Sequence, residues 1–133
     1  MANVLYPLFK QALLNKEHDL NSDSILAVLL DSADYTYDDA HDAVGDLSAG
    51  VVATSGALGS PTIADGVFDT ADFSWTTVTG DQCEAIALYN DTPTTPTADP
   101  LILFMDTGIT GMPITPNGGN INVTVNASGW FAL

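Results

Sequence analysis

The chain has 133 residues, which is enough for one domain that buries a sizeable core without disulfides or bound metal. It carries 17 acidic residues against two lysines, a formal net charge of -15 at pH 7. A surface with so few cations cannot displace the counterions of a phosphate backbone or of anionic lipid headgroups, so the composition excludes direct nucleic-acid and membrane partners.

The N-terminal segment predicts a short amphipathic helix. Apolar side chains between Leu5 and Leu14 recur at helical spacing, and Pro7 falls in the first turn, where proline is tolerated. A helix this short is marginal alone, so it must pack on its own sheet or on a neighbouring subunit. We assign residues 1–133 to a single β-rich domain, with residues 1–20 as an N-terminal arm or helix. The segment lacks the basic region of a signal peptide, which indicates a protein made without export.

Residues 25–46 combine a buried strand with an acidic excursion. The run Ile25 to Leu30 is apolar throughout and only six residues long, which predicts a strand covered on both faces. The acidic segment Asp31 to Asp46 follows it. A short helix after an N-cap at Asp38 or Asp39 is expected within this segment.

The second half of the chain is a series of short β-runs. The stretch Gly50 to Asp72 reads as a strand, a Gly/Ser/Pro turn and a second strand at 62–68, and we predict that it organises the rest of the chain. Further strands are expected at 72–79, 83–89, 101–106, 120–126 and 129–133. Several of them alternate apolar and polar residues, as half-exposed antiparallel strands do. The fold class is therefore mainly β: an antiparallel β-sandwich or jelly-roll-like barrel with a short N-terminal helix. A Pro/Thr-rich loop over 91–100 is expected to be extended.

The acidic segment is the first candidate for ion binding, because clustered carboxylates suit a hard cation such as calcium. Its spacing is not that of an EF-hand, so a solvated acidic surface is the preferred interpretation and calcium binding the alternative. His18 and His41 have no cysteine or histidine at ligand spacing. We expect no metal and no cofactor.

No set of residues forms a convincing catalytic group. Ser55 is not in a nucleophile-elbow motif, and Asp69 and Asp72 fall in a turn where a stabilising role is preferred to carboxylate chemistry. Cys83 is the only cysteine, so we interpret it as a buried thiol on a strand. The sequence predicts a protein that is not an enzyme.

Several phrases of the sequence resemble a group of small virion proteins of tailed bacteriophages. They are Met1-Ala2-Asn3 leading to Leu5-Tyr6, VATSGAL (52–58), GVFD (66–69), TGDQ (79–82), EAIALY (84–89) and TPNGG (115–119). The resemblance covers most of the chain, in order. It departs from the group in the acidic segment 38–46 and in the loop 92–100.

The resemblance implies a non-enzymatic structural protein of the virion, made in the host cytoplasm. Because the acidic chain is unsuited to the DNA-filled interior, a capsid decoration or cement protein on the outer surface of the head is the first hypothesis. Its partners would be the major capsid protein and further copies of itself, with a homotrimer favoured. Two alternatives remain: a tail or head-tail completion component, and a carbohydrate-binding adhesin-like module that uses Trp75 or Trp130.

Both ends of the chain carry apolar side chains that need either the core or a partner to cover them. Packing of both ends in the core of the chain itself is the alternative to a partner contact. The predicted partner-contact residues are Leu5, Tyr6, Leu8, Phe9, Trp130, Phe131 and Leu133.

Overall fold

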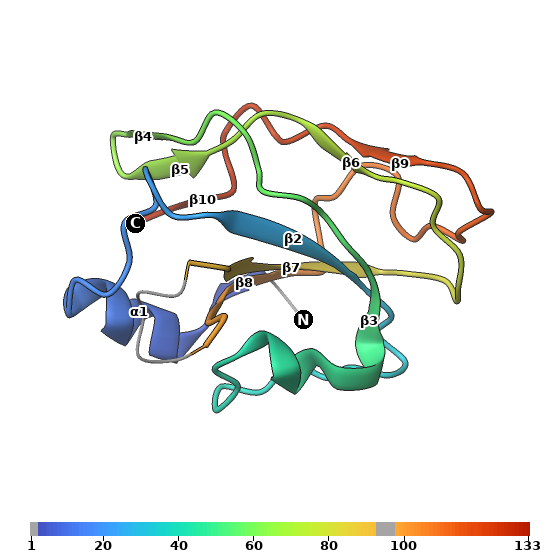
Figure 1. The fold of residues 1–133 in the computed structure, drawn as a ribbon, viewed down its shortest axis with the longest axis horizontal. Coiled ribbons are helices and arrows are strands. Elements are labelled where there is room, and N and C mark those ends of the chain that lie inside the picture. Colours follow the sequence, from blue (N-terminus) through green and yellow to red (C-terminus); the bar gives the residue numbers. More distant parts are fainter. Residues whose placement is uncertain (1–2, 93–97) are drawn as a thin grey trace.

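The computed structural model describes residues 3–92 and 98–133 of the chain. Strands hold 33% of the residues and helices 12%, so the fold is mainly β, as the sequence predicts. Its main sheet has five antiparallel strands (Figure 1). Their order is β1 (Val4–Leu5), β8 (Leu101–Met105), β7 (Ala85–Asn90), β2 (Ile25–Leu30) and β3 (Val51–Thr54).

Shorter strands form a second layer over one face of the main sheet (Figure 1). One group has the order β10 (Phe131–Ala132), β5 (Val67–Asp69) and β4 (Thr62–Ala64); the other pairs β6 (Phe73–Trp75) with β9 (Ile121–Val123). The helix α1 (Pro7–Leu14) and the 3-10 helix η1 (Val44–Gly50) lie on the opposite side of the sheet. The arrangement is sandwich-like, with a helical cover on the outer face.

Strands β2 and β7 form the centre of the main sheet. They pair over six residues, from Ile25 opposite Asn90 to Leu30 opposite Ala85. All six residues of β7 are buried, and in β2 only Leu26 is half-buried. A strand covered on both faces needs apolar residues at every position rather than at alternate ones, so the uninterrupted run at 25–30 predicts this strand correctly.

The Gly50 to Asp72 stretch is not the organising element that we predicted. Its first strand, β3, lies at the edge of the main sheet, where Val51 is exposed. The expected strand at 62–68 is instead the hairpin β4–β5, which turns at Asp65 and Gly66, both with positive φ. The central position belongs to β7. Of the Pro/Thr-rich loop predicted over 91–100, residues 93–97 lie outside the described residues.

The prediction of a short helix after an N-cap at Asp38 or Asp39 is wrong in its position. The Asp38 carboxylate accepts the backbone N–H of Ala40 at 2.8 Å, which closes a local turn instead of starting a helix. The helical segment begins at Val44, as a 3-10 helix. Here Asp46 Oδ2 accepts the N–H groups of Asp42 and Ala43 at 2.8 and 3.0 Å, and the bonds from Ala43 and Asp42 lower the pKa of that carboxyl.

The N-terminal segment is integrated into the sheet and the core. Strand β1 pairs with β8, and Asn3 Oδ1 accepts the N–H groups of Asp106 and Thr107. Helix α1 covers residues 7–14 and buries Phe9, while Tyr6 at its N-cap is fully buried. In the part of the chain that the structure describes, no helix has both the length and the apolar character needed to cross a bilayer.

Gly129 sets the approach of the C-terminal strand to β5, and its replacement tests this packing. Its φ is +81°, and an added Cβ would lie 2.5 Å from Val67 Cγ1 and 2.7 Å from the Phe68 carbonyl oxygen. We therefore expect Gly129→Ala to lower the free energy of unfolding by about 3 kcal/mol. Gly118→Ala, at φ +87° with open space around it, is the matched control and should cost only about 1 kcal/mol. Urea unfolding measures both, and equal losses would contradict the steric argument.

Candidate contact surfaces

The two terminal segments, predicted separately as contact regions, lie side by side in the structure. The Phe9 ring of α1 meets the Phe131 ring of β10 edge to face, with centroids 6.1 Å apart. Phe131 also packs on Phe68, its partner in the β5–β10 register, at 5.5 Å. Three segments distant in sequence therefore share one aromatic cluster.

The structure distributes the seven predicted contact residues between core and surface. Tyr6, Phe9 and Trp130 are buried within the chain itself, which is the alternative that the sequence left open for the two ends. Leu5, Leu8 and Phe131 are half-buried. Leu133 is 72% exposed, so it offers the largest apolar area of the seven to a partner.

We call the surface formed by the end of α1, the following loop, the β4–β5 hairpin and β10 the terminal patch. These segments enclose a hollow of about 360 Å³. Its apolar members are Leu13, Leu20, Ile63, Phe68, Phe131 and Leu133. Ile63 is 48% exposed although it lies on a strand. Sequence reasoning missed Ile63 as a contact residue because its exposure depends on β4 being a sheet edge.

A buried polar group, His18, lies beside the terminal patch. Its ring packs on Phe9 at 5.0 Å, and its Nδ1 lies 2.9 Å from Asn90 Nδ2. The same Asn90 nitrogen donates to Asp23 Oδ2 at 2.7 Å, while Asn90 Oδ1 accepts the Thr92 N–H at 2.8 Å. Since an amide nitrogen only donates, His18 Nδ1 must accept, and the imidazole is the neutral Nε2–H tautomer. Burial lowers the pKa of His18, against the opposing effect of Asp23 and Glu17.

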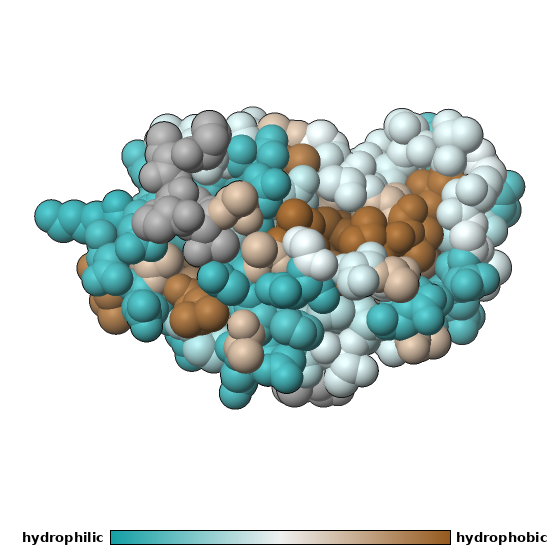
Figure 2. Space-filling view, turned by 60° about the horizontal axis from the view of Figure 1, so that its bottom comes forward, coloured by the Kyte–Doolittle hydropathy of each residue, from teal (hydrophilic) through white to brown (hydrophobic). Residues whose placement is uncertain are grey.

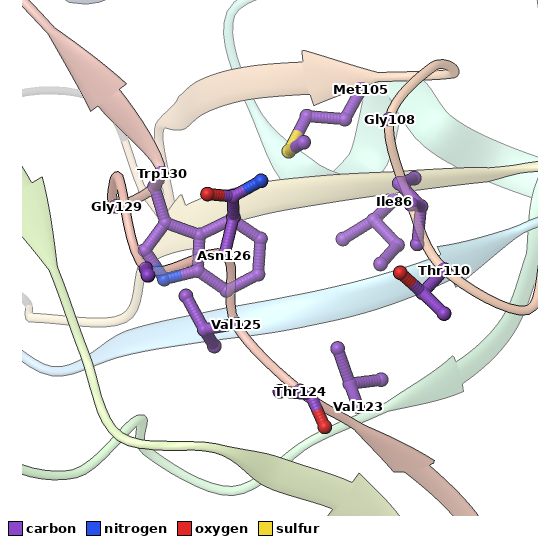
Figure 3. A pocket seen from close by; sticks show the side chains of 12 residues that line it. Ile86, Met105, Gly108, Thr110, Val123, Thr124, Val125, Asn126, Gly129 and Trp130 are labelled. Atoms are coloured by element: carbon purple, nitrogen blue, oxygen red, sulfur yellow. The ribbon is translucent and has the colours of Figure 1, made fainter.

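A second hollow, which we call the interlayer groove, opens between the main sheet and the second layer. It encloses about 300 Å³ and is lined on the main-sheet side by Ile86 and Met105 (Figure 3). Val123, Val125 and Trp130 line it from the second layer. Figure 2 shows apolar side chains gathered in a hollow on one face of the molecule, bordered largely by residues of intermediate hydropathy.

The acidic segment contributes to one carboxylate cluster. Oxygen atoms of Asp31, Asp34 and Asp81 lie within 4.8 Å of one another. The sequence pairs Asp31 with Asp34, but Asp81 joins them only through the fold. Asp31 is buried, and its Oδ1 accepts the Ala33 N–H at 2.8 Å, which is a structural role for that oxygen.

The residues considered for catalysis have structural partners. Ser55 Oγ accepts the Ala27 N–H at 2.9 Å and donates to the Gly56 carbonyl oxygen at 2.7 Å. Asp72 accepts the Val125 N–H at 2.8 Å, which links the start of β6 to the chain beyond β9. Cys83 is a buried free thiol, and burial, with the nearby Asp31, Glu84 and Asp81 carboxylates, raises its pKa to about 11.

Neither tryptophan lies on the open surface, since Trp75 is in the core and Trp130 is exposed only toward the interlayer groove. Trp75 is 1% exposed, and its indole N–H donates to the Ala27 carbonyl oxygen at 3.1 Å. Trp130 is 8% exposed and donates to Thr70 Oγ1 at 2.8 Å. Sugar stacking needs an accessible aromatic face, so these contacts give the carbohydrate-binding alternative no support.

Comparison with known proteins adds no assignment. The chain matches no protein-family model, and none of the curated proteins is significantly similar to it.

The buried His18 predicts that the free energy of unfolding decreases as the pH is lowered. Because its pKa in the folded chain lies below the unfolded value of about 6.5, the unfolded chain binds the extra proton first and stability is lost as pH falls below that value. The slope should approach, at most, about 1.4 kcal/mol per pH unit between about pH 7 and pH 5. Urea unfolding across this range measures it. His18→Gln should flatten the slope, and an unchanged slope in this variant would contradict the assignment.

Proposed function

We propose that this chain is a non-enzymatic structural protein of a tailed-bacteriophage virion, binding the outer surface of the head as a decoration or cement protein. The observation that carries the proposal is the terminal patch. On an otherwise acidic chain, α1, the β4–β5 hairpin and β10 together present one apolar surface around the exposed Leu133 and Ile63. The resemblance of its sequence phrases to small virion proteins supports the same role.

The charge favours the outside of the head. With 17 acidic residues and two lysines, the chain would be repelled by packaged DNA, whereas an outer surface imposes no such penalty. A high negative charge also keeps a protein soluble while many copies accumulate before assembly. The major capsid protein is the proposed partner, and the resemblance to β-rich cement proteins favours a trimer.

The terminal patch is suited to cementing because it leaves apolar side chains exposed to water until a partner covers them. Removing that apolar area from water would then stabilise the contact. Burying one large aliphatic side chain completely contributes about 1.5–3 kcal/mol. Leu133 and Ile63 are 72% and 48% exposed, so a partner that covers both can gain a substantial part of this. A trimer would link three such contacts, and its binding to the shell would then gain further by multivalency.

A tail or head-tail completion component is the second candidate, and one feature favours it. Strand β4 is the free edge of its sheet, and all three of its residues are exposed. Such an edge can pair with a strand of a neighbouring subunit and propagate a ring. That role predicts ring assembly, or attachment to tails, by the isolated protein.

Co-sedimentation with heads that lack this protein tests the proposed function. We expect saturable binding, and Leu133→Asp should weaken it by at least about tenfold because a carboxylate replaces an apolar contact. Val51→Asp is the matched control, since Val51 is an exposed apolar residue on β3 that does not line the terminal patch. Both variants should keep the wild-type melting temperature to within a few degrees. Absence of binding to heads, with rings or tail attachment instead, would favour the second candidate.

A further inference from the structure

The interlayer groove shares no lining residue with the hollow of the terminal patch, and it has one rigid wall. Trp130 is held there at two points: its backbone N–H donates to the Phe68 carbonyl oxygen and its indole N–H to Thr70 Oγ1, both at 2.8 Å. The Asp72 carboxylate fixes the backbone at Val125, also at 2.8 Å. A wall whose groups are already bonded loses little conformational entropy when a ligand packs on it.

The opposite wall is adaptable. It consists of Met105 at the end of β8 (Figure 3) and of Ile109 in the following loop. Ile109 lies between Gly108 and Gly111 in the sequence. Both glycines have positive φ, and an added Cβ on either would meet open space. Methionine fills irregular gaps and is favoured at surfaces that accept varied apolar partners. The groove therefore combines a fixed indole wall with a wall that can adjust.

The size of the groove favours a peptide anchor over a metabolite. Its 300 Å³ is at the lower end of the range of about 300–1,000 Å³ typical of small-molecule sites. The lining includes only three polar side chains, Thr110, Thr124 and Asn126, and no charged one. One or two apolar side chains from another protein fit this volume and chemistry.

Charge decides which protein can approach. The only cations in the sequence are Lys10 and Lys16, so every charged side chain from residue 17 onward is acidic at neutral pH. The exposed Asp72 accepts the N–H of the groove residue Val125 at 2.8 Å, and Asp69 lies beside the groove residue Gly129, where an added Cβ would be 3.4 Å from Asp69 Cβ. A segment of this chain from residue 17 onward therefore has no cation to place beside an apolar anchor, whereas a partner segment with lysine or arginine beside its anchor is attracted to the groove.

We propose that the interlayer groove is a docking site for an apolar peptide segment of a partner protein, flanked on both sides by lysine or arginine. The apolar side chains enter between Met105 and Trp130, and the flanking cations lie over the acidic surroundings. The site has its own lining residues, distinct from those of the terminal patch, and the proposal does not rest on the role in a virion.

Two synthetic peptides test the proposal against the isotope-labelled full chain by NMR titration. Both carry a leucine pair; one has two lysines on each side and the other two glutamates. We expect the lysine peptide to shift the amide signals of Ile86, Val123 and Trp130, and to bind at least about tenfold more tightly than the glutamate peptide at low salt. Equal affinities, no binding by either, or shifts confined to the terminal patch would each overturn the proposal.

Matched variants separate this site from the terminal patch. Ile109→Ser should weaken the lysine peptide by about tenfold, whereas Ile63→Ser, the same change in the terminal patch, should leave its affinity unchanged. If Ile109→Ser does not fold, Val125→Phe replaces it in the test, because its larger side chain fills the groove from the rigid wall.

Full affinity for the lysine peptide in a folded groove variant would overturn the assignment. Groove shifts that grow with the concentration of the protein alone would also overturn it, by making a second copy the occupant.

Discussion

The burial of strand β7 on both faces is the constraint on which the rest of this structure depends. Its six residues lie between β2 and β8 and are all buried, so the sheet must be covered on each side. Ile86 faces the second layer, where Trp130 and Val125 meet it across the interlayer groove. On the other side, α1 and η1 provide the cover. Since neither cover is a regular sheet matched to the first, each leaves hollows at its margins, and these are the places where a partner can contact apolar side chains.

The sequence predicts best where one local rule acts alone. The run Ile25 to Leu30 forms a strand because every position in it is apolar, and Phe73 and Trp75 face inward because they alternate with the exposed Ser74. Local rules fail where two compete. Asp38 has the chemistry of an N-cap, but its carboxylate bonds to Ala40 and closes a turn, so the helix starts later and depends on Asp46.

The contact surfaces could be predicted only in part, because they depend on pairing across the chain. Hydrophobicity identifies Leu133 and Phe131 as residues that need cover, but nothing local indicates that β10 joins β5 and so places them beside Ile63. In the same way, Asp81 reaches Asp31 and Asp34 only through the fold. The groove residues Ile86, Met105 and Val125 come from three predicted strands, yet the sequence does not show that the space between those strands stays open.

The pairing of both chain ends with distant strands has a consequence for the order of folding. Val4 pairs with Phe104 and Phe131 with Phe68, so each closure joins residues far apart in sequence, which is slow compared with forming the β4–β5 hairpin. During synthesis the main sheet cannot be completed before β8 has been made, and the terminal patch cannot exist before residue 133 has been added. A nascent or truncated chain that lacks β10 therefore also lacks the surface proposed for assembly.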